Sequence, residues 1–223
     1  MKQLTLFCLL FVFQIFGAIP DICVHCWYEV PNSKLSTVAQ SPKPPGIAGS
    51  EGKLIGNGAA FDSRRNRLIV TGGGSISYSG NEVYAFSLDS LKWTRIKNGA
   101  SVYDNDDLLY AYYRNGKAVP DSQQPRPGFN YDQIDYDSTT DNLYIFGAPF
   151  AATHGKTWKN IFQLNLSTLA WSRPTDIRSG MFIGNVSARD PSTGQIWFME
   201  IRVMDGYRLL ILFLEHSPIM EII

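Results

Sequence analysis

The chain carries an internal repeat of short apolar segments. Residues 61–72 recur 75 positions later as residues 136–147, and each copy runs from an aromatic-Asp-Ser turn into an apolar run that ends in glycine. Residues 83–95 recur 78 positions later as residues 161–173, and both copies end in Trp, a hydroxyl residue and Arg. One unit of this size cannot bury its apolar face alone, so such units stack on their neighbours. The repeat therefore predicts an all-β fold of stacked sheets.

Each copy divides into four short strands joined by turns. In the first copy the apolar run 68–71 is too short for a helix, and residues 83–88 alternate as a half-buried strand does. Residues 58–61 and 91–96 supply the other two strands. A third unit begins near Ile183, with the Asp-containing turn again present. We therefore predict about three four-stranded antiparallel sheets.

The amino terminus has the layout of a secretory signal peptide. Lys2 precedes an apolar run from Leu4 to Phe16, and the small residues Gly17 and Ala18 follow. An apolar run of about 13 residues is too short to cross a hydrocarbon layer of roughly 30 Å as a helix. We expect cleavage after Ala18, a secreted or periplasmic mature chain, and no membrane attachment once the signal is removed.

The charge balance argues against a polyanionic partner. Lys plus Arg and Asp plus Glu each total 20, so the formal net charge is zero. A chain without a net positive field gains little electrostatic attraction to nucleic acid. We predict no nucleic-acid partner, and we expect the many aromatic side chains, 13% of the residues, to fill the sheets.

Two cysteines remain after the signal segment. Cys23 and Cys26 have C-x-x-C spacing, and in an oxidising compartment such a pair is a disulfide candidate. A redox site would need a helix start that lowers the thiol pKa. A zinc site would need two more ligands, and the remaining histidines, His154 and His216, lie far along the chain. Redox and metal roles stay open as alternatives, but we predict no metal site and no cofactor.

Three segments carry a resemblance to a known family. They are residues 68–74, residues 81–86 with Trp93, and residues 143–147 with Trp171. In their apolar strands, glycines and spaced aromatic residues, they resemble the kelch-repeat β-propellers, including the central propeller of the galactose oxidase type. The resemblance covers roughly residues 54–200 and implies four-stranded blades around an axis. Members of this family serve as binding scaffolds and, less often, as oxidases.

The resemblance is incomplete in places. Ala148 stands where a second glycine is usual, and Glu200 and Ile201 replace the glycines of the third unit. Copper radical oxidases of the family imply two His, two Tyr and a Tyr–Cys crosslink. Both cysteines of the mature chain lie outside the repeats, so these ligands have no counterpart and we predict no catalytic residue.

The predicted organisation has four parts. They are a signal peptide at 1–18, an extended segment at 19–53, propeller blades at 54–214 (about 54–96, 129–174 and 183–214), and an atypical tail at 215–223. We expect Trp27 in the extended segment to pack against an outer strand. Closed propellers have about four to eight blades, so three blades indicate a truncated or frameshifted piece of a longer protein.

One set of loops should form the binding face. In an up-and-down blade, the loop between the second and third strands and the connection to the next blade emerge on the same side. This brings together segments 74–80, 97–128 and 148–159, and loops on a rigid scaffold commonly carry binding groups. The candidate ligand-binding residues are Tyr78, Tyr103, Asp104, Arg126, Phe150, His154 and Trp158.

These side chains suit sugar stacking and hydrogen bonding, although the aromatic ones could equally pack their own loops. Residues 104–107 contain three Asp, but they lack the Gly and the distal Glu of a known calcium loop. The sequence favours a secreted kelch-type β-propeller binding module for carbohydrate or protein ligands over an enzyme. The alternative is a fragment of an extracellular carbohydrate-active, oxidase-like enzyme whose catalytic residues lie in missing blades.

Overall fold

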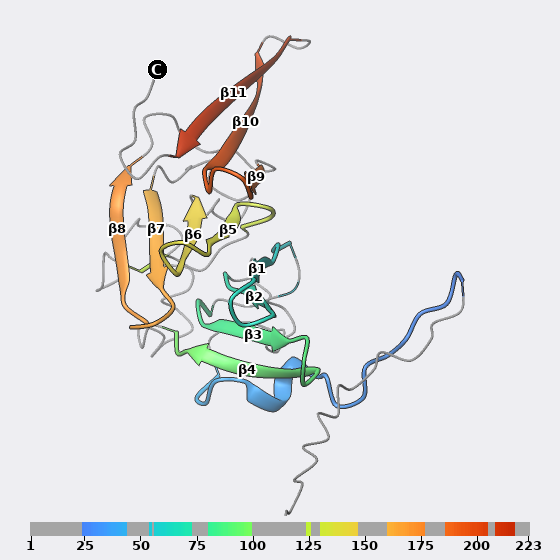
Figure 1. Ribbon diagram of the computed structural model, residues 1–223. Coiled ribbons are helices and arrows are strands. Elements are labelled where there is room, and N and C mark those ends of the chain that lie inside the picture. The colour runs from blue at the N-terminus through green and yellow to red at the C-terminus, as the bar shows by residue number, and fades with distance from the viewer. Residues whose placement is uncertain are drawn as a thin grey trace, which may run out of the picture.

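The computed structural model describes residues 24–43, 54, 56–72, 80–99, 124–125, 130–146, 160–176, 186–204 and 208–216. These residues form three separate antiparallel sheets and one short 3₁₀ helix, and no α-helix occurs among them (Figure 1). The expected all-β class is therefore confirmed. Apolar side chains recur at every second position in short segments. This pattern favours strands, because successive side chains of a strand point to opposite faces of the sheet.

The strands follow one another in space as they do in sequence. Sheet 1 consists of β1 (Ala60–Asp62), β2 (Arg67–Val70), β3 (Val83–Ser87) and β4 (Lys92–Lys97). Sheet 2 consists of β5 (Ile134–Asp137), β6 (Asn142–Phe146), β7 (Asn160–Asn165) and β8 (Trp171–Asp176). Sheet 3 consists of β9 (Val186–Arg189), β10 (Ile196–Met204) and β11 (Arg208–His216).

The third unit departs from the expectation of four strands. Three strands lie within its described residues, and β10 and β11 are each 9 residues long. β11 reaches His216 and so extends into the segment that the sequence assigned to a tail. The apolar run in this segment is long enough to pair with β10 along its whole length.

The repeat is also present in the backbone. In each sheet an Asp stands at the end of the first strand or directly after it. Its Oδ1 accepts the backbone N–H two residues later at 2.8–3.1 Å; these are Asp62, Asp137 and Asp190. Four residues after each Asp the backbone is left-handed, at Asn66 (φ 45°), Asp141 (φ 60°) and Gly194 (φ 78°). Asn, Asp and Gly are the residues that tolerate this conformation best. The same turn chemistry therefore folds all three units.

The outer hairpins of sheets 1 and 2 repeat as closely. Leu91 and Leu169 are both left-handed, at φ 54° and 58°. The N–H of Leu91 donates to Ser87 O at 2.9 Å, and that of Leu169 to Asn165 O at 2.8 Å. The outermost strand pair of each sheet also carries a register shift at equivalent positions. Two sequences that differ at most positions thus adopt one local geometry.

The first strands of the three sheets lie next to one another. β5 contacts β1 on one side and β9 on the other, while β4, β8 and β11 lie away from this centre (Figure 1). Parallel bridges join Asn57 to Tyr131 and Asp132 to Val186, just before the inner strands. Ser187 adds two hydrogen bonds, from its N–H and its hydroxyl, to Asp132 O. The inner strands therefore run in the same direction around a common region.

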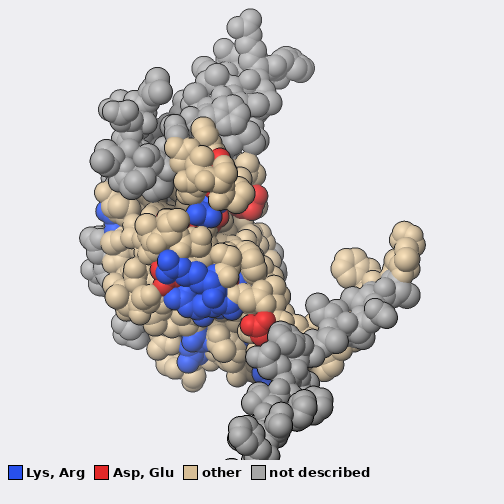
Figure 2. Space-filling view, viewed as in Figure 1, with Lys and Arg blue, Asp and Glu red and all other residues tan. Residues whose placement is uncertain are grey.

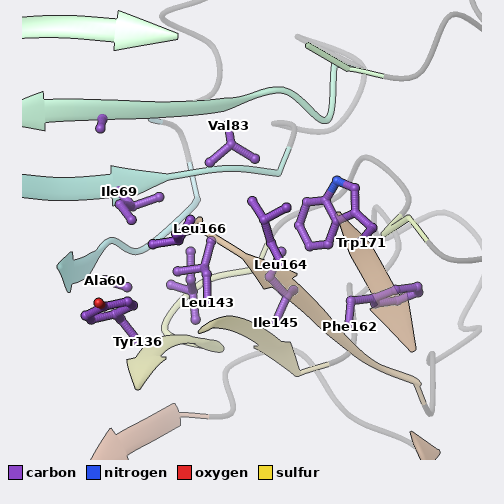
Figure 3. Close-up of a cluster of buried hydrophobic side chains, with 12 residues drawn as sticks. Ala60, Ile69, Val83, Tyr136, Leu143, Ile145, Phe162, Leu164, Leu166 and Trp171 are labelled. Carbon is purple, nitrogen blue, oxygen red and sulfur yellow. The ribbon is translucent and has the colours of Figure 1, made fainter. Parts of the chain in front are cut away.

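The main core lies between sheets 1 and 2 (Figure 3). We call the face that a sheet turns toward the preceding sheet its upstream face, and the opposite face its downstream face. The downstream face of sheet 1 contributes Ala60, Ile69, Val83 and Ala85. The upstream face of sheet 2 contributes Tyr136, Leu143, Ile145, Phe162, Leu164 and Trp171.

The N-terminal segment packs against the upstream face of sheet 1. It contains the 3₁₀ helix η1 (Leu35–Val38), and Leu35 is buried against Val70 and Tyr84. The expectation of an extended surface segment at 19–53 therefore needs correction, because residues 33–40 are fixed to the sheet. Trp27 does not pack on a strand as expected, since its side chain is 100% exposed.

Candidate functional site

The predicted ligand-binding residues all lie outside the described residues. Tyr78, Tyr103, Asp104, Arg126, Phe150, His154 and Trp158 belong to segments whose placement the structure does not describe. The strands from which these segments leave are described. The site can therefore be built from the strand ends that carry the connections.

These strand ends come together at one end of the sheets. β2 ends and β3 begins there, β4 ends there, and the chain enters β5 there. Asn130 lies before β5 and its Nδ2 donates to Thr71 O, just after β2, at 3.2 Å. Asn81, just before β3, donates from Nδ2 to Pro125 O at 2.9 Å. The connections that hold the predicted residues are thus anchored side by side.

A layer of buried polar residues lies at this end, and we call it the polar floor. Its members are no more than 2% exposed: Thr71, Asn81, Glu82, Asn130 and Gln133. Buried polar groups require hydrogen-bond partners, since an unpaired one costs about 1–3 kcal/mol. A concentration of such groups at a loop-bearing end is characteristic of a region that fixes backbone rather than one that only fills space.

Asn130 is the central member of the polar floor. Its backbone N–H donates to Asn57 Oδ1 at 2.8 Å, and its own Oδ1 accepts the N–H of Gly58 at 3.1 Å. With the bond from its Nδ2 to Thr71 O, one amide side chain joins the start of β1, the end of β2 and the entry to β5. The side chain therefore fixes the loop end of sheet 1 to that of sheet 2.

Gly58 permits the close approach of these two segments. A Cβ at this position would lie 2.2 Å from the carbonyl oxygen of Tyr131, far inside van der Waals contact. Any side chain would therefore force the parallel bridge between Asn57 and Tyr131 apart. Gly58 does not have a left-handed backbone conformation. A glycine is needed at this position because there is no room for a side chain.

The N-terminal segment reaches the same end of the molecule. Gln40 Oε1 accepts the N–H of Gly99 at 2.7 Å, and the N–H of Gln40 donates to the Tyr84 hydroxyl at 3.2 Å. Gly99 also lies close to the side chains of Asn81 and Glu82. Residues 33–40 thus support the exit of the chain from β4.

Thr71 Oγ1 and Gln124 Oε1 are buried polar atoms of this region that have no hydrogen-bond partner among the described residues. Both lie where the chain continues into the connecting segments. The polar floor therefore has hydrogen-bonding capacity beyond the bonds formed between its described members.

The opposite end of the inner strands carries charges instead of amides. Arg65 donates from both terminal nitrogens to Asp141, each at 2.7 Å, and also to Asp62 at 3.0 Å. Arg67 Nε adds a bond to Asp62 at 2.8 Å. We call Arg65 and Asp141 the arginine clasp, because they join the first turn of sheet 1 to the first turn of sheet 2. Lys and Arg side chains gather over sheet 1 on the face shown in Figure 2.

Contacts at the arginine clasp shift the pKa values of Asp141 and of the neighbouring Tyr136. The hydrogen bonds from Arg65 hold the pKa of Asp141 far below its usual range, against the opposing effect of burial. Burial, with the hydrogen bond donated to Asp141 at 2.8 Å, raises the pKa of the Tyr136 hydroxyl. Ser167 also donates to Asp141. Because the Asp141 carboxylate is ionised and saturated with donors, it is suited to holding two sheets together and not to proton transfer.

A second charged group joins sheets 2 and 3. Arg189 Nη2 lies 3.3 Å from Asp137 Oδ1. Burial raises the pKa of Asp137, but the hydroxyls of Thr140 and Thr139 and the charge of Arg189 lower it overall. Burial raises the pKa of Asp135 to about 6, although Arg189 opposes this shift.

One of the three cysteines lies within the described residues. Cys26 is disulfide-bonded, while Cys8 and Cys23 lie outside the described residues. The pairing of Cys23 with Cys26 therefore stays a prediction. Within the described ranges no three His, Cys, Asp or Glu side chains are placed to hold a metal ion. In the same ranges no helix has the length and apolar character needed to cross a bilayer.

Sequence reasoning missed the polar floor and the arginine clasp. The amide residues of the floor stand in polar segments between strands, which locally read as solvated turns. They are buried by contacts between distant segments: segment 56–58 approaches segment 130–133, and Pro125 and Gly99 lie against Asn81 and Glu82. The clasp joins Arg65 to Asp141, and at the 75-residue offset these two residues correspond to Thr140 and Asn66, so the repeat gave no signal for the pair.

The chain was also compared with known proteins. No protein-family model matches the chain, and no curated protein matches it.

Proposed function

We propose that the chain is an exported kelch-type β-propeller module that binds a carbohydrate through the connections above the polar floor. The observation that carries the proposal is the convergence of these connections. Segments 73–79, 100–123, 126–129 and 147–159 all begin and end at the loop-bearing end of sheets 1 and 2. Binding groups commonly collect on loops held by a rigid scaffold.

The arrangement of the sheets supports a propeller. Four-stranded antiparallel sheets with strands in sequence order, adjacent inner strands and parallel inner-strand bridges are what blades around an axis require. The repeat of the Asp turn in all three sheets supports blades of one kind. The kelch type follows from the sequence resemblance.

The composition of the connections supports a sugar as the ligand. They contain Tyr78, Trp158 and Phe150, whose rings can stack on a sugar ring, with Asp104 and Arg126 as hydrogen-bonding groups. Tyr and Trp combine an apolar face with a polar hydrogen-bonding group, which suits ligands that stay partly exposed to solvent. The polar floor contributes by fixing the loop ends, which limits the ordering cost of binding.

A glycan array tests this function. The purified full chain should bind a defined group of glycans, and the Tyr78→Ala and Trp158→Ala variants should each lose about tenfold or more in affinity, as expected for anchoring aromatic residues. Trp27→Ala is the matched control, because Trp27 is a fully exposed Trp that does not belong to the connections.

Two outcomes would contradict the proposal. Absence of binding to every glycan, combined with capture of a protein ligand, would replace carbohydrate by protein. Equal binding by the wild type, both loop variants and the Trp27→Ala control would remove these aromatic residues from the site. Thermal unfolding of each variant identifies losses that come from misfolding.

A further inference from the structure

The chain contains three Asn–Gly pairs, Asn57–Gly58, Asn98–Gly99 and Asn115–Gly116. An asparagine that precedes glycine is prone to spontaneous deamidation, because glycine has no Cβ to hinder the attack of its backbone nitrogen on the preceding side chain. The first two pairs lie within the described residues, so the groups that surround them can be compared.

The first pair is held at both reacting groups. Asn57 Oδ1 accepts the backbone N–H of Asn130 at 2.8 Å, and the N–H of Gly58 donates to Asn130 Oδ1 at 3.1 Å. The parallel bridge between Asn57 and Tyr131 fixes the backbone as well. The side-chain amide and the glycine nitrogen cannot turn toward each other without breaking these bonds, so this pair should be inert in the folded chain.

The second pair directly follows β4 and is held at only one of the two groups. Asn98 is exposed, and within the described ranges its side chain forms no hydrogen bond. The N–H of Gly99 donates to Gln40 Oε1 at 2.7 Å. The contact between Gly99 and Gln40 is therefore what restrains the reacting nitrogen.

Gln40 is placed by the docking of residues 33–40 on sheet 1. Its own N–H donates to the Tyr84 hydroxyl at 3.2 Å. Side chains of β4 also donate hydrogen bonds of 2.9 Å to backbone carbonyls of the segment, which lies beside β4 in Figure 1. The acceptor of the Gly99 N–H thus comes from a segment about 60 residues earlier in the chain.

We propose that Asn98 is a site of spontaneous deamidation whose rate is set by the hydrogen bond between Gly99 and Gln40. In this reaction the Gly99 nitrogen gives its proton to water or hydroxide and bonds to Asn98 Cγ. The Cγ–Nδ2 bond breaks, and Nδ2 takes up a proton from water and leaves as ammonia. Water then opens the succinimide and leaves aspartate or isoaspartate at position 98.

The hydrogen bond to Gln40 slows the first step for two reasons. A deprotonated Gly99 nitrogen would face the lone pairs of Gln40 Oε1, which disfavours loss of the proton. The hydrogen bond also fixes the orientation of the peptide plane, which has to rotate for the nitrogen to reach Asn98 Cγ. Removal of this acceptor should therefore speed the reaction at Asn98 and leave Asn57 unaffected.

The reaction would change the anchoring of the connection that follows β4. A Cβ at Gly99 would lie 2.8 Å from Asn81 Oδ1 and 3.2 Å from Glu82 Cγ, so this backbone packs closely on the polar floor. Isoaspartate adds one atom to the main chain, and either product adds a negative charge one residue away from the contact with Glu82. Both changes weaken the fit of Gly99 between Gln40 and the floor.

Peptide mass spectrometry of the full chain tests the proposal. The purified protein is incubated at mildly alkaline pH and digested, and the acid forms of the peptides that contain Asn57 and Asn98 are quantified over time. Asn98 should convert several times faster than Asn57. Gln40→Ala should raise the rate at Asn98 by about tenfold, as expected from the loss of one hydrogen bond, with no change at Asn57.

Two further variants serve as controls. Thr37→Ala changes an exposed side chain of the same segment, whose hydroxyl donates to Lys34 O, and should leave both rates unchanged. Gln40→Glu keeps an acceptor oxygen at position 40 and should keep the reaction at Asn98 slow.

Three outcomes would overturn the proposal. The first is an equal rate at Asn98 in the wild type and in Gln40→Ala. The second is conversion of Asn57 as fast as that of Asn98 in the native chain. The third is an increase at both sites in Gln40→Ala, which would assign the protection to the fold as a whole and not to this one contact.

Discussion

The two interfaces between neighbouring sheets use the same positions of the repeat for opposite chemistry. Between sheets 1 and 2, Ala60 and Tyr136 are buried in an apolar core. The equivalent positions between sheets 2 and 3 are Asp135 and Arg189. The turns and strand registers are shared, so the backbone geometry does not dictate which chemistry fills an interface. At these positions one interface is apolar and the other is charged.

Ionisation of Asp141 in the first interface and of Asp135 in the second affects stability in opposite directions. The folded-state pKa of Asp141 lies below its usual value, so its charged form stabilises the fold, and this contribution is lost as the pH falls below about 4. The folded-state pKa of Asp135 is raised to about 6, so its charged form opposes folding. The stability due to Asp135 is therefore greatest in acid and falls as the pH rises from about 4 to 6.

The largest effect is expected at the arginine clasp. Asp141→Ala should lower the free energy of unfolding by about 2–3 kcal/mol. It removes the acceptor of the Tyr136 hydroxyl and of Ser167, and it breaks two hydrogen bonds of Arg65, which keeps its bond to Asp62. We place it below the usual cost of breaking a buried pair because the Arg65 side chain is 34% exposed. Urea denaturation at pH 7 measures it.

The matched control for this prediction is Asp89→Ala. Asp89 is also a turn carboxylate of the repeat region, but it is exposed, and within the described part of the chain its side chain accepts a hydrogen bond from Asn66 only. Its loss should change stability by no more than about 0.5 kcal/mol. Equal costs for the two substitutions would show that the clasp does not hold the sheets together.

A smaller, pH-dependent effect is expected at the second interface. Asp135→Asn should stabilise the fold by about 1 kcal/mol at pH 7.5, where the wild-type carboxylate is ionised in a partly buried site, and should have little effect at pH 4.5. Urea denaturation at the two pH values measures the difference. A destabilised Asp135→Asn at pH 7.5 would mean that the attraction of Arg189 outweighs the cost of burying the Asp135 carboxylate.

The smallest effect is expected at Arg64, beside the clasp. Its side chain is 46% exposed and its Nη1 lies 3.9 Å from Asp141 Oδ1, so solvent screens the pair. Arg64→Ala should change the free energy of unfolding by less than about 0.5 kcal/mol. A loss comparable with that of Asp141→Ala would place the electrostatic support of the first interface on Arg64 rather than on Arg65.

The sequence predicted the strands well because their signals are local. The apolar run after Arg67, the alternation from Val83 and the Asp turns all act within a few residues, and each formed the expected element. The equivalence of sheets 1 and 2 was readable for the same reason. Nothing in these local patterns distinguishes an interface filled by Tyr136 from one filled by Arg189.

The missed features depend on contacts between distant segments. Residues 33–40 contain few apolar side chains, so their fixation by Leu35 and by hydrogen bonds to β4 is not visible in composition. The polar floor is buried by a parallel approach that Gly58 permits, and its amides otherwise resemble those of any surface turn. The predicted ligand-binding residues lie beyond the described part of the chain, so they stay predictions.

The docking of residues 33–40 gives the molecule a natural optical probe. Trp93 donates its indole N–H to Ser33 O at 2.9 Å and lies beside Val38 and Leu35. Cleavage of the chain between residues 43 and 56 would allow this segment to dissociate from the sheet. The Trp93 indole would then be exposed to solvent. The emission spectrum of Trp93 would shift to longer wavelength, so fluorescence would report detachment of the segment without any added dye.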